Sequence, residues 1–239
     1  MSAVADELKQ ALGEFGYYPD RLFLERMEAF HRLLVERNRS MDLTNVPEEQ
    51  MPRRHYTDSL WPFLADPSLI SQGDNVLDVG SGAGFPGLPL AILMPDQPIT
   101  LLEANGKRCT FLREAVQLLG LDKVNILERR AEEAGRDAET RERYRVTVSR
   151  AVAALPELLE YMLPLTAPGG YALCWKGQKA EEEMAGAAGA ARLLGAGALV
   201  CLNCPDTTQG SCLVRADKTG LTPSVYPRRT GIPHKRPIL

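Results

Sequence analysis

The sequence predicts an α/β fold in which helices cover both faces of a mostly parallel sheet of seven strands. Between residues 76 and 194, short apolar stretches of strand length alternate with longer stretches of helical periodicity, the pattern of parallel βαβ units. A glycine-rich turn follows the first strand and leads directly into a helix, as in open sheets that bind a nucleotide-like ligand. The last two strand-like stretches lack an intervening helix, so we expect an antiparallel last strand.

Residues 1–70 are expected to form a helical extension that caps the sheet. Residues 38–45 interrupt its helical pattern and predict a loop with capping residues. The apolar stripe of the helix before that loop recurs at helical spacing and comprises Leu22, Phe23, Met27, Phe30 and Leu34.

A basic stretch follows the predicted loop and contains Arg53, Arg54 and His55 beside an aromatic residue. These side chains suit contact with a phosphate backbone. They equally suit a solvated helix face in which Arg54 pairs with Asp58, four residues later.

The glycine turn has the form D-x-G-x-G-x-G, beginning at Asp78 and continuing through Gly80, Gly82 and Gly84. The same turn also satisfies the dinucleotide pattern G-x-G-x-x-G, which ends at Gly87. We expect the Asp78 carboxylate, at the end of the strand, to repel a pyrophosphate and to attract a ligand that carries an ammonium and a sulfonium. S-adenosylmethionine is such a ligand, and a dinucleotide or a ligand-free structural turn are the alternatives.

The core is expected to span residues 71–216 and to alternate regularly after the turn. Strands are predicted at 98–103, 124–127, 144–148, 170–175, 199–203 and 212–215, and helices at 106–119, 156–165 and 181–194.

Polar side chains at the strand ends are candidate ligand contacts, because ligands of such sheets bind at the carboxyl edge. Glu103 closes the second strand, where a carboxylate would accept hydrogen bonds from ribose hydroxyls; a solvated strand-end acid is the alternative. Ala131 and Glu132 follow the third strand and suit an adenine edge, unless Glu132 is an exposed loop acid. Arg150 ends the fourth strand and would hold a ligand, or would pair with an acid such as Glu132.

The last segment, residues 217–239, is expected to be a basic tail. From residue 218 onward it contains five Lys or Arg and no Asp or Glu, and its four prolines disfavour regular structure. Such a segment on a chain of net charge −3 suits contact with RNA, and a solvated disordered tail is the alternative.

The composition excludes several classes of protein. Hydrophobic residues make up 44% of the 239 residues and charged residues 25%, as in a soluble globular protein, and neither a membrane span nor a signal peptide is predicted. We therefore expect a cytoplasmic monomer that binds no membrane. The five cysteines do not suggest a disulfide framework, and Cys201 and Cys204 are interpreted as buried hydrophobes rather than as a redox or zinc pair.

Motifs of other chemistries are absent from the sequence. There is no Asp/Asn-Pro-Pro-aromatic after the fourth strand, no Cys-Pro nucleophile there, and no H-E-x-x-H, G-x-S-x-G or G-K-[ST]. We assign no catalytic residue and no metal. Methylation of guanine N7 would need none of these groups, because N7 has a free lone pair and carries no proton.

Several blocks, in order, make the sequence resemble the ribosomal RNA small-subunit methyltransferase G family, also called glucose-inhibited division protein B. They run from about residue 38 to the C-terminus: Asp42-Leu43-Thr44, Arg54-His55, Asp78 to Gly87, Gly106-Lys107-Arg108, Arg130 to Glu133, Ser149-Arg150-Ala151, Lys176-Gly177 and Tyr226-Pro227-Arg228-Arg229. Asp42 departs from the family, which more usually has Asn, and Trp175 departs from a common Leu.

The resemblance implies a Rossmann-like class I S-adenosylmethionine-dependent methyltransferase fold in a single domain. It implies methylation of N7 of a guanine in the 530 loop of 16S rRNA, with 16S rRNA or the small ribosomal subunit as partner. The cofactor residues are then expected to be Asp78, Gly80, Gly82, Gly84, Phe85, Glu103, Ala104, Asn105, Ala131, Glu132 and Arg150. The RNA-binding residues are expected to be Arg53, Arg54, His55, Lys107, Arg108, Lys176, Arg228, Arg229, Lys235 and Arg236.

Two other functions stay open at this point. A nicotinamide-dependent oxidoreductase would share the glycine turn, and a non-catalytic RNA-binding module would share the fold and the basic tail.

Overall fold

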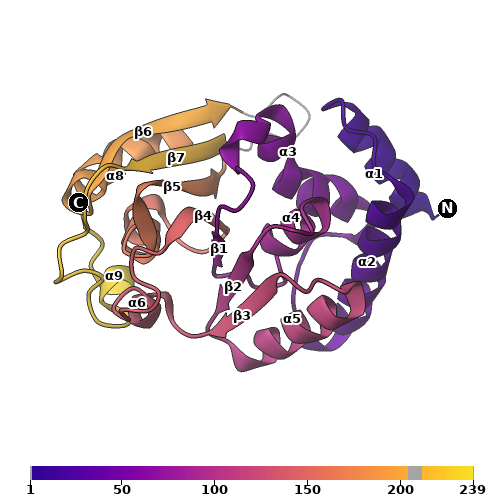
Figure 1. Ribbon diagram of the computed structural model, residues 1–239, viewed down its shortest axis with the longest axis horizontal. Helices are drawn as coiled ribbons and strands as arrows, with labels where there is room; N and C mark the ends of the chain where they lie inside the picture. The colour runs from indigo at the N-terminus through magenta and orange to yellow at the C-terminus, as the bar shows by residue number, and fades with distance from the viewer. Residues whose placement is uncertain (1, 204–211, 239) are drawn as a thin grey trace.

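The computed structural model describes residues 2–203 and 212–238, which form one sheet with helices on both faces (Figure 1). Within these ranges the strand order is β3-β2-β1-β4-β5-β7-β6. Strand β7 is antiparallel to β5 and β6, whereas the pairs among β1 to β5 are parallel. The predicted mostly parallel sheet with an antiparallel last strand is confirmed. Its strands are β1 (Val76–Val79), β2 (Ile99–Glu103), β3 (Val124–Glu128), β4 (Tyr144–Arg150), β5 (Thr166–Lys176), β6 (Ala196–Asn203) and β7 (Cys212–Lys218).

The helices follow the predicted alternation. The α-helices are α1 (Ala3–Gly13), α2 (Arg21–Met41), α3 (Asp58–Ala65), α4 (Gly87–Leu93), α5 (Gly106–Leu119), α6 (Ala131–Ala134), α7 (Leu155–Met162), α8 (Ala180–Leu193) and α9 (Ile232–Lys235). The turns η1 (Glu48–Gln50) and η3 (Pro67–Leu69) are 3₁₀, and η2 (Pro52–Thr57) is a π-helical turn.

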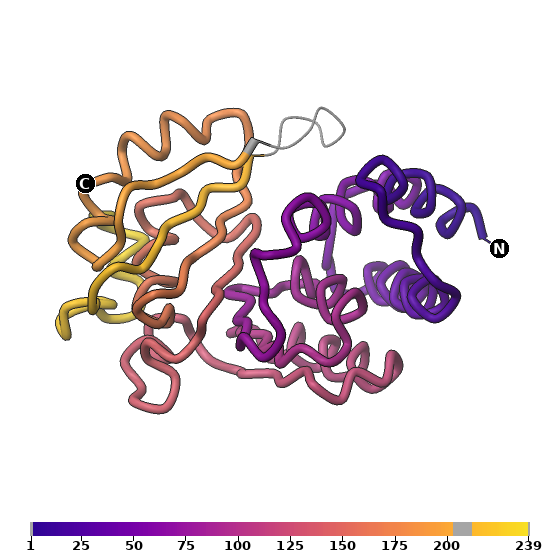
Figure 2. Tube along the Cα trace, turned by 45° about the horizontal axis from the view of Figure 1, so that its top comes forward, coloured from indigo at the N-terminus to yellow at the C-terminus, as the bar shows by residue number. Residues whose placement is uncertain are grey.

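Alternate residues of each strand enter two separate hydrophobic cores, because side chains along a strand point to opposite faces. Val76 and Leu101 pack into a core that includes apolar residues of α1 to α5. Leu77 and Leu102, their neighbours in sequence, pack into a second core with α6, α7 and α8. In Figure 2, α1 and α2 lie at one end of the molecule and the C-terminal residues at the other.

Helix α2 is longer than the sequence predicted. It continues through residues 38–41 and ends where Asp42 adopts a left-handed conformation with φ of 50°. The side chain of Asn38 caps this end, because its Oδ1 accepts hydrogen bonds from Leu43 N (2.7 Å) and Thr44 N (2.9 Å). Asn and Asp both tolerate the left-handed region, which explains why Asp42 can stand where Asn is more usual. One residue of the predicted stripe, Leu22, is 54% exposed.

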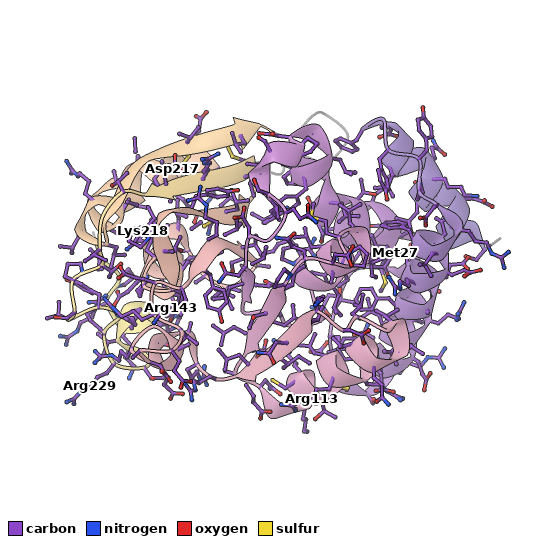
Figure 3. The ribbon with its side chains drawn as sticks, viewed as in Figure 1. Met27, Arg113, Arg143, Asp217, Lys218 and Arg229 are labelled. Atoms are coloured by element: carbon purple, nitrogen blue, oxygen red, sulfur yellow. A yellow bond between two sulfur atoms is a disulfide. The ribbon has the colours of Figure 1, made fainter. Side chains whose placement is uncertain are left out.

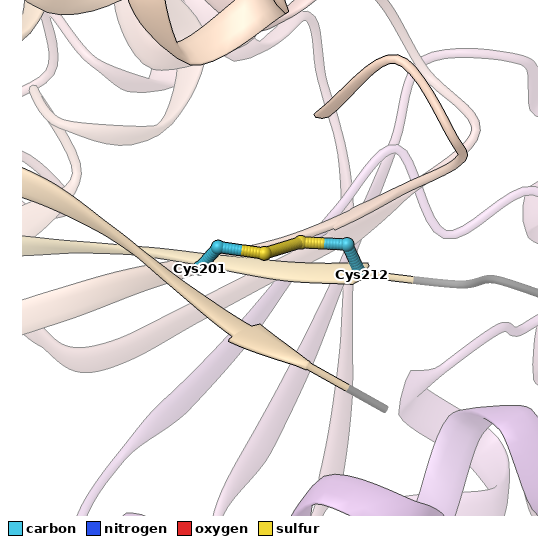
Figure 4. Close-up of a disulfide and its surroundings, with 2 residues drawn as sticks. All are labelled: Cys201 and Cys212. Atoms are coloured by element: carbon cyan, nitrogen blue, oxygen red, sulfur yellow. A yellow bond between two sulfur atoms is a disulfide. The ribbon is translucent and has the colours of Figure 1, made fainter. Parts of the chain in front are cut away.

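The expectation that Cys201 is a buried hydrophobe outside any disulfide is wrong. Cys201 in β6 and Cys212 in β7 form a disulfide between adjacent antiparallel strands (Figure 4). The buried thiols Cys109 and Cys174 are free, and Cys204 lies outside the described residues.

Residues 219–238, here called the C-terminal segment, pack against the core. Just before it, Lys218 is fully buried, with its Nζ 3.2 Å from Glu142 Oε1, so it is not available to RNA as a tail residue. The other acceptors of that ammonium are Leu194 O and the Thr222 hydroxyl. Glu142 also accepts a hydrogen bond from Thr222 N, which fixes the start of the segment.

An ion pair fixes the middle of the C-terminal segment. Arg228 donates from Nε and Nη2 to the two carboxylate oxygens of Glu160 (3.0 and 2.6 Å), and Glu160 is fully buried in α7. Arg141 adds hydrogen bonds to the carbonyls of Thr222 and Tyr226. The neighbouring Arg229 instead lies at the outer edge of the molecule (Figure 3). The four prolines therefore shape an ordered segment that includes α9.

Candidate functional site

A cavity of about 770 Å³ opens at the carboxyl edge of the sheet. The ends of β1, β2 and β4 form its floor, and residues of the loop after α2, of α6 and α7, and of the C-terminal segment form its walls. Its volume lies within the usual range for ligand sites, roughly 300–1,000 Å³. The sequence pattern thus predicts the location of the cavity correctly.

The glycine turn after β1 forms one wall through Gly80 and Gly82, both with positive φ. Gly84 lies beneath the turn and does not line the cavity. Its φ is 92°, and a Cβ there would lie 2.4 Å from Leu88 Cδ1, so only glycine fits.

Asp78 differs from its expected role. It alternates with Leu77 and Val79 along β1, so its side chain points to the opposite face of the sheet, toward the start of α4. It is fully buried, does not line the cavity, and accepts a hydrogen bond from Gly87 N at 3.0 Å. Burial raises the pKa of Asp78 to about 7. The carboxylate therefore holds the end of the turn, and the expectation that it faces the ligand is corrected.

Glu103 ends β2 and lines the cavity, with only 7% of the residue exposed. Its Oε2 accepts a hydrogen bond from Gly82 N (2.9 Å) and its Oε1 accepts one from Asn105 N (2.8 Å). These two bonds fix the carboxylate in one orientation against the glycine turn. Because a carboxylate has about four acceptor sites, two remain for ligand hydroxyls.

Beside Glu103 a smaller hollow opens at the start of α5. Ala104 and Asn105 line it, and Asn105 caps the helix by accepting hydrogen bonds from Lys107 N and Arg108 N. The cationic side chains around this hollow are Lys107, Arg108 and Arg130. Asn105 does not line the main cavity, whereas Ala104 and Arg108 do.

Ala131 and Glu132 begin α6 and line the main cavity. Glu132 is not an exposed loop acid, because it is 5% exposed and its Oε1 accepts a hydrogen bond from Gly231 N at 2.9 Å. This bond holds the C-terminal segment against the cavity, so Thr230 and Gly231 become part of its wall.

Phe85 and His55 form an aromatic pair in the cavity wall, with ring centroids 4.5 Å apart. Arg150 Nη2 donates to His55 Nδ1 (3.0 Å), so His55 donates from Nε2 to the Thr44 hydroxyl (2.6 Å). Burial and the adjacent Arg150 charge lower the pKa of His55 to about 3, which keeps the imidazole neutral. The prediction that His55 contacts an RNA phosphate is therefore wrong.

The guanidinium of Arg150 joins the strand end to the helical extension. Its Nη1 donates to Asp58 Oδ2 at 2.8 Å, and its Cζ lies 4.9 Å from the centroid of the Phe85 ring. Arg150 thus pairs with Asp58 and not with Glu132. Arg54, which would have paired with Asp58 in the solvated-helix alternative, donates to Gln50 instead.

Three residues predicted to bind RNA are engaged by partners within the chain. Arg53 forms ion pairs with Glu7 and Glu14, and Arg228 forms the pair with Glu160 described above. Lys176 has a side chain that is 7% exposed and donates to Ala153 O, with a second contact to Glu183. Sequence spacing could not reveal these partners, because most of them lie far along the chain. The exposed members of the predicted set are Arg54, Lys107, Arg229, Lys235 and Arg236.

The sequence did not single out Glu157, Tyr161 and His234 as a group. Glu157 and Tyr161 lie one turn apart on α7, and His234 lies on α9 in the C-terminal segment, yet all three line the cavity. A carboxylate in the first turn of the helix after β4 was a usable signal, since that helix begins at the carboxyl edge.

The geometry fits S-adenosylmethionine. Glu103 offers carboxylate oxygens for ribose hydroxyls, the glycine turn leaves room for close approach, and Ala131 provides a small surface suited to a flat base. In the described residues, no group of three or more His, Cys, Asp or Glu is arranged to hold a metal ion. None of the described helices has the combined length and hydropathy of a membrane span.

Solved structures of other proteins share the fold of this chain. The carbon methyltransferase CurJ superposes with a TM-score of 0.53 at 13% identity, covering 89% of this chain and 71% of that one. Fibrillarin of Methanococcus jannaschii, a pre-rRNA processing protein, superposes with a TM-score of 0.51 at 14% identity, covering 63% and 68%. The fold, together with the glycine turn, is that of a class I methyltransferase.

The sequence comparisons give the family. The family GidB, rRNA small subunit methyltransferase G, matches residues 23–209. Proteins named ribosomal RNA small subunit methyltransferase G are 40% identical in Pelotomaculum thermopropionicum, over 100% of both chains, and 38% identical in Lactobacillus johnsonii, over 95% of this chain and 96% of that one. The chain belongs to the rRNA small subunit methyltransferase G family, and its cofactor is S-adenosylmethionine.

Proposed function

We propose that this protein methylates N7 of a guanine in the 530 loop of 16S rRNA, acting as a cytoplasmic monomer. The observation that carries the proposal is the cavity at the carboxyl edge, in a chain that belongs to a family of small-subunit rRNA methyltransferases. When bound, S-adenosylmethionine supplies an electrophilic methyl group.

The side chains in the cavity suit an acceptor that needs no general base. His55 is held neutral with both ring nitrogens engaged, and Glu103 and Glu132 accept hydrogen bonds from backbone amides. Guanine N7 attacks through a lone pair and has no proton to lose. The protein then accelerates transfer by aligning the two reactants and by excluding water.

The hollow at the start of α5 suits RNA phosphates. Lys107 and Arg130 are exposed there, beside the cavity that we assign to the cofactor. We expect the double variant Lys107→Ala, Arg130→Ala to bind small-subunit RNA more weakly. The salt dependence of log K should flatten by about 1.4, because each contact to single-stranded RNA contributes roughly 0.7 to the slope.

Filter binding at several salt concentrations measures this slope. Arg21→Ala is the matched control, because Arg21 on α2 has a 91% exposed side chain and pairs only locally with Glu25. If the double variant kept the wild-type salt dependence, the hollow at the start of α5 would not be part of the RNA interface.

A further inference from the structure

The cavity has a wall that the cofactor pattern does not explain. Helix α7 contributes Glu157 and Tyr161 to it, and the C-terminal segment contributes Thr230, Gly231 and His234. None of these residues belongs to the glycine turn or to the end of β2, where the cofactor is expected. The wall brings Glu157 next to His234, which lies 77 residues later in the sequence, and this requires the C-terminal segment to be docked.

Glu157 is nearly enclosed but is not neutralised by a lysine or arginine among the described residues. Its side chain is 11% exposed, and its carboxylate accepts from Tyr161 Oη at 2.7 Å and from His234 Nδ1 at 3.2 Å. Glu160, on the same helix, is in contrast paired with the guanidinium of Arg228. Tyr161 and His234 do not use all the lone pairs of the Glu157 carboxylate. Its oxygens can therefore accept further hydrogen bonds from a ligand in the cavity.

The groups around Glu157 suit a flat ligand. The side chain of His234 is 76% exposed although it lines the cavity, so its ring is open to stacking by an incoming base. Burial and the adjacent Glu157 raise the pKa of Tyr161, so its hydroxyl keeps the proton that it donates to Glu157.

We propose that Glu157 and His234 form the binding site for the target guanine, with Glu157 accepting from N1–H and the 2-amino group and His234 stacking on the ring. This assignment rests on the proposed function. Among the four bases, guanine presents two adjacent donors on its Watson–Crick edge, and a carboxylate accepts both. The Watson–Crick edge of adenine or cytosine would place a ring-nitrogen lone pair against the carboxylate.

The orientation of the purine agrees with N7 as the acceptor. N7 lies on the opposite side of the purine from N1 and the 2-amino group. A guanine held by Glu157 therefore directs N7 across the cavity, away from α7. Enzymes that act on a base extrude it into a pocket and recognise it by hydrogen bonds to its Watson–Crick edge. The hydrogen bond from Gly231 N–H to Glu132 would hold the segment that contains α9, so that His234 Nδ1 stays within hydrogen-bonding distance of Glu157.

The test compares small-subunit RNA carrying guanosine or inosine at the target position, since inosine retains N7 and N1–H but lacks the 2-amino group. We expect wild-type kcat/KM for methyl transfer to be roughly 10- to 100-fold lower with inosine, the effect of losing one hydrogen bond to a charged acceptor. In Glu157→Gln the rate with guanosine should fall by a similar factor, and the guanosine-to-inosine ratio should approach one. Glu133→Gln, an exposed acid on α6, is the control and should keep the wild-type ratio.

Calorimetric titration with S-adenosylmethionine shows whether Glu157→Gln is folded. If it is not, His234→Ala tests the site, because it truncates an exposed ring. Loss of stacking should lower kcat/KM for both RNAs by roughly 5- to 150-fold while the ratio is kept. Wild-type kinetics in His234→Ala, or a wild-type guanosine-to-inosine ratio in folded Glu157→Gln, would overturn the guanine-binding site. Either result would leave the proposed function standing. A wild-type product other than 7-methylguanosine would overturn the proposed function and the assignment together.

Discussion

Arg228→Ala should lower the free energy of unfolding by about 3 kcal/mol, because it leaves the carboxylate of Glu160 buried and uncompensated. Glu160 is fully buried in α7, and the Arg228 guanidinium donates to it from Nε, to both carboxylate oxygens, and from Nη2, to Oε2. The loss should also release the C-terminal segment from the cavity wall, which would weaken methyl transfer. Urea unfolding, followed by circular dichroism, measures the change in stability.

Arg229→Ala is the matched control. Arg229 is adjacent in sequence but exposed, so its replacement should change stability by less than about 0.5 kcal/mol. In a Glu160→Gln background, Arg228→Ala should cost much less, since no buried charge remains. If Arg228→Ala unfolds at the same urea concentration as the wild type, the ion pair does not anchor the segment.

Glu103→Ala should weaken the binding of S-adenosylmethionine by about 2–3 kcal/mol, or roughly 30- to 150-fold. The variant loses the acceptors that we propose for the ribose hydroxyls, and it also loses the hydrogen bonds that hold Gly82 N and Asn105 N in place. Isothermal titration calorimetry gives the dissociation constant directly.

Glu128→Ala tests whether this effect is specific. Glu128 ends the neighbouring strand β3 and pairs with Glu103 in the sheet register, but its carboxylate forms an exposed ion pair with Arg113. Its loss should leave cofactor affinity unchanged. Unchanged affinity in Glu103→Ala would refute the assignment of Glu103 to the ribose.

The elements of the fold were predictable because their patterns are local. Helix α5 begins and ends at the predicted residues 106 and 119, and the alternation of strands and helices identified the parallel sheet. Glu103 and Ala131 were placed at the cavity for the same reason, since a strand end in a parallel sheet fixes the location of the residue. The disulfide was not predictable, because Cys201 and Cys212 meet only through the β6–β7 register.

The side-chain partners were less predictable. The basic residues were interpreted as an RNA surface because the spacing of charges does not reveal a partner at long range. Arg228 meets Glu160 across 68 residues and Arg150 meets Asp58 across 92. Asp78 was misplaced for a different reason: the alternation along β1 already assigns it to the same face as Val76, which packs in the core with α4.

Mapping methyl incorporation on 16S rRNA tests the central claim most directly. Small-subunit RNA, free or in ribosomal particles, would be incubated with the protein and S-adenosylmethionine labelled in its methyl group, then digested and analysed by mass spectrometry. We predict one 7-methylguanosine, located in the 530 loop. A methyl group on another atom or in another region, or RNA binding without any incorporation, would contradict the account.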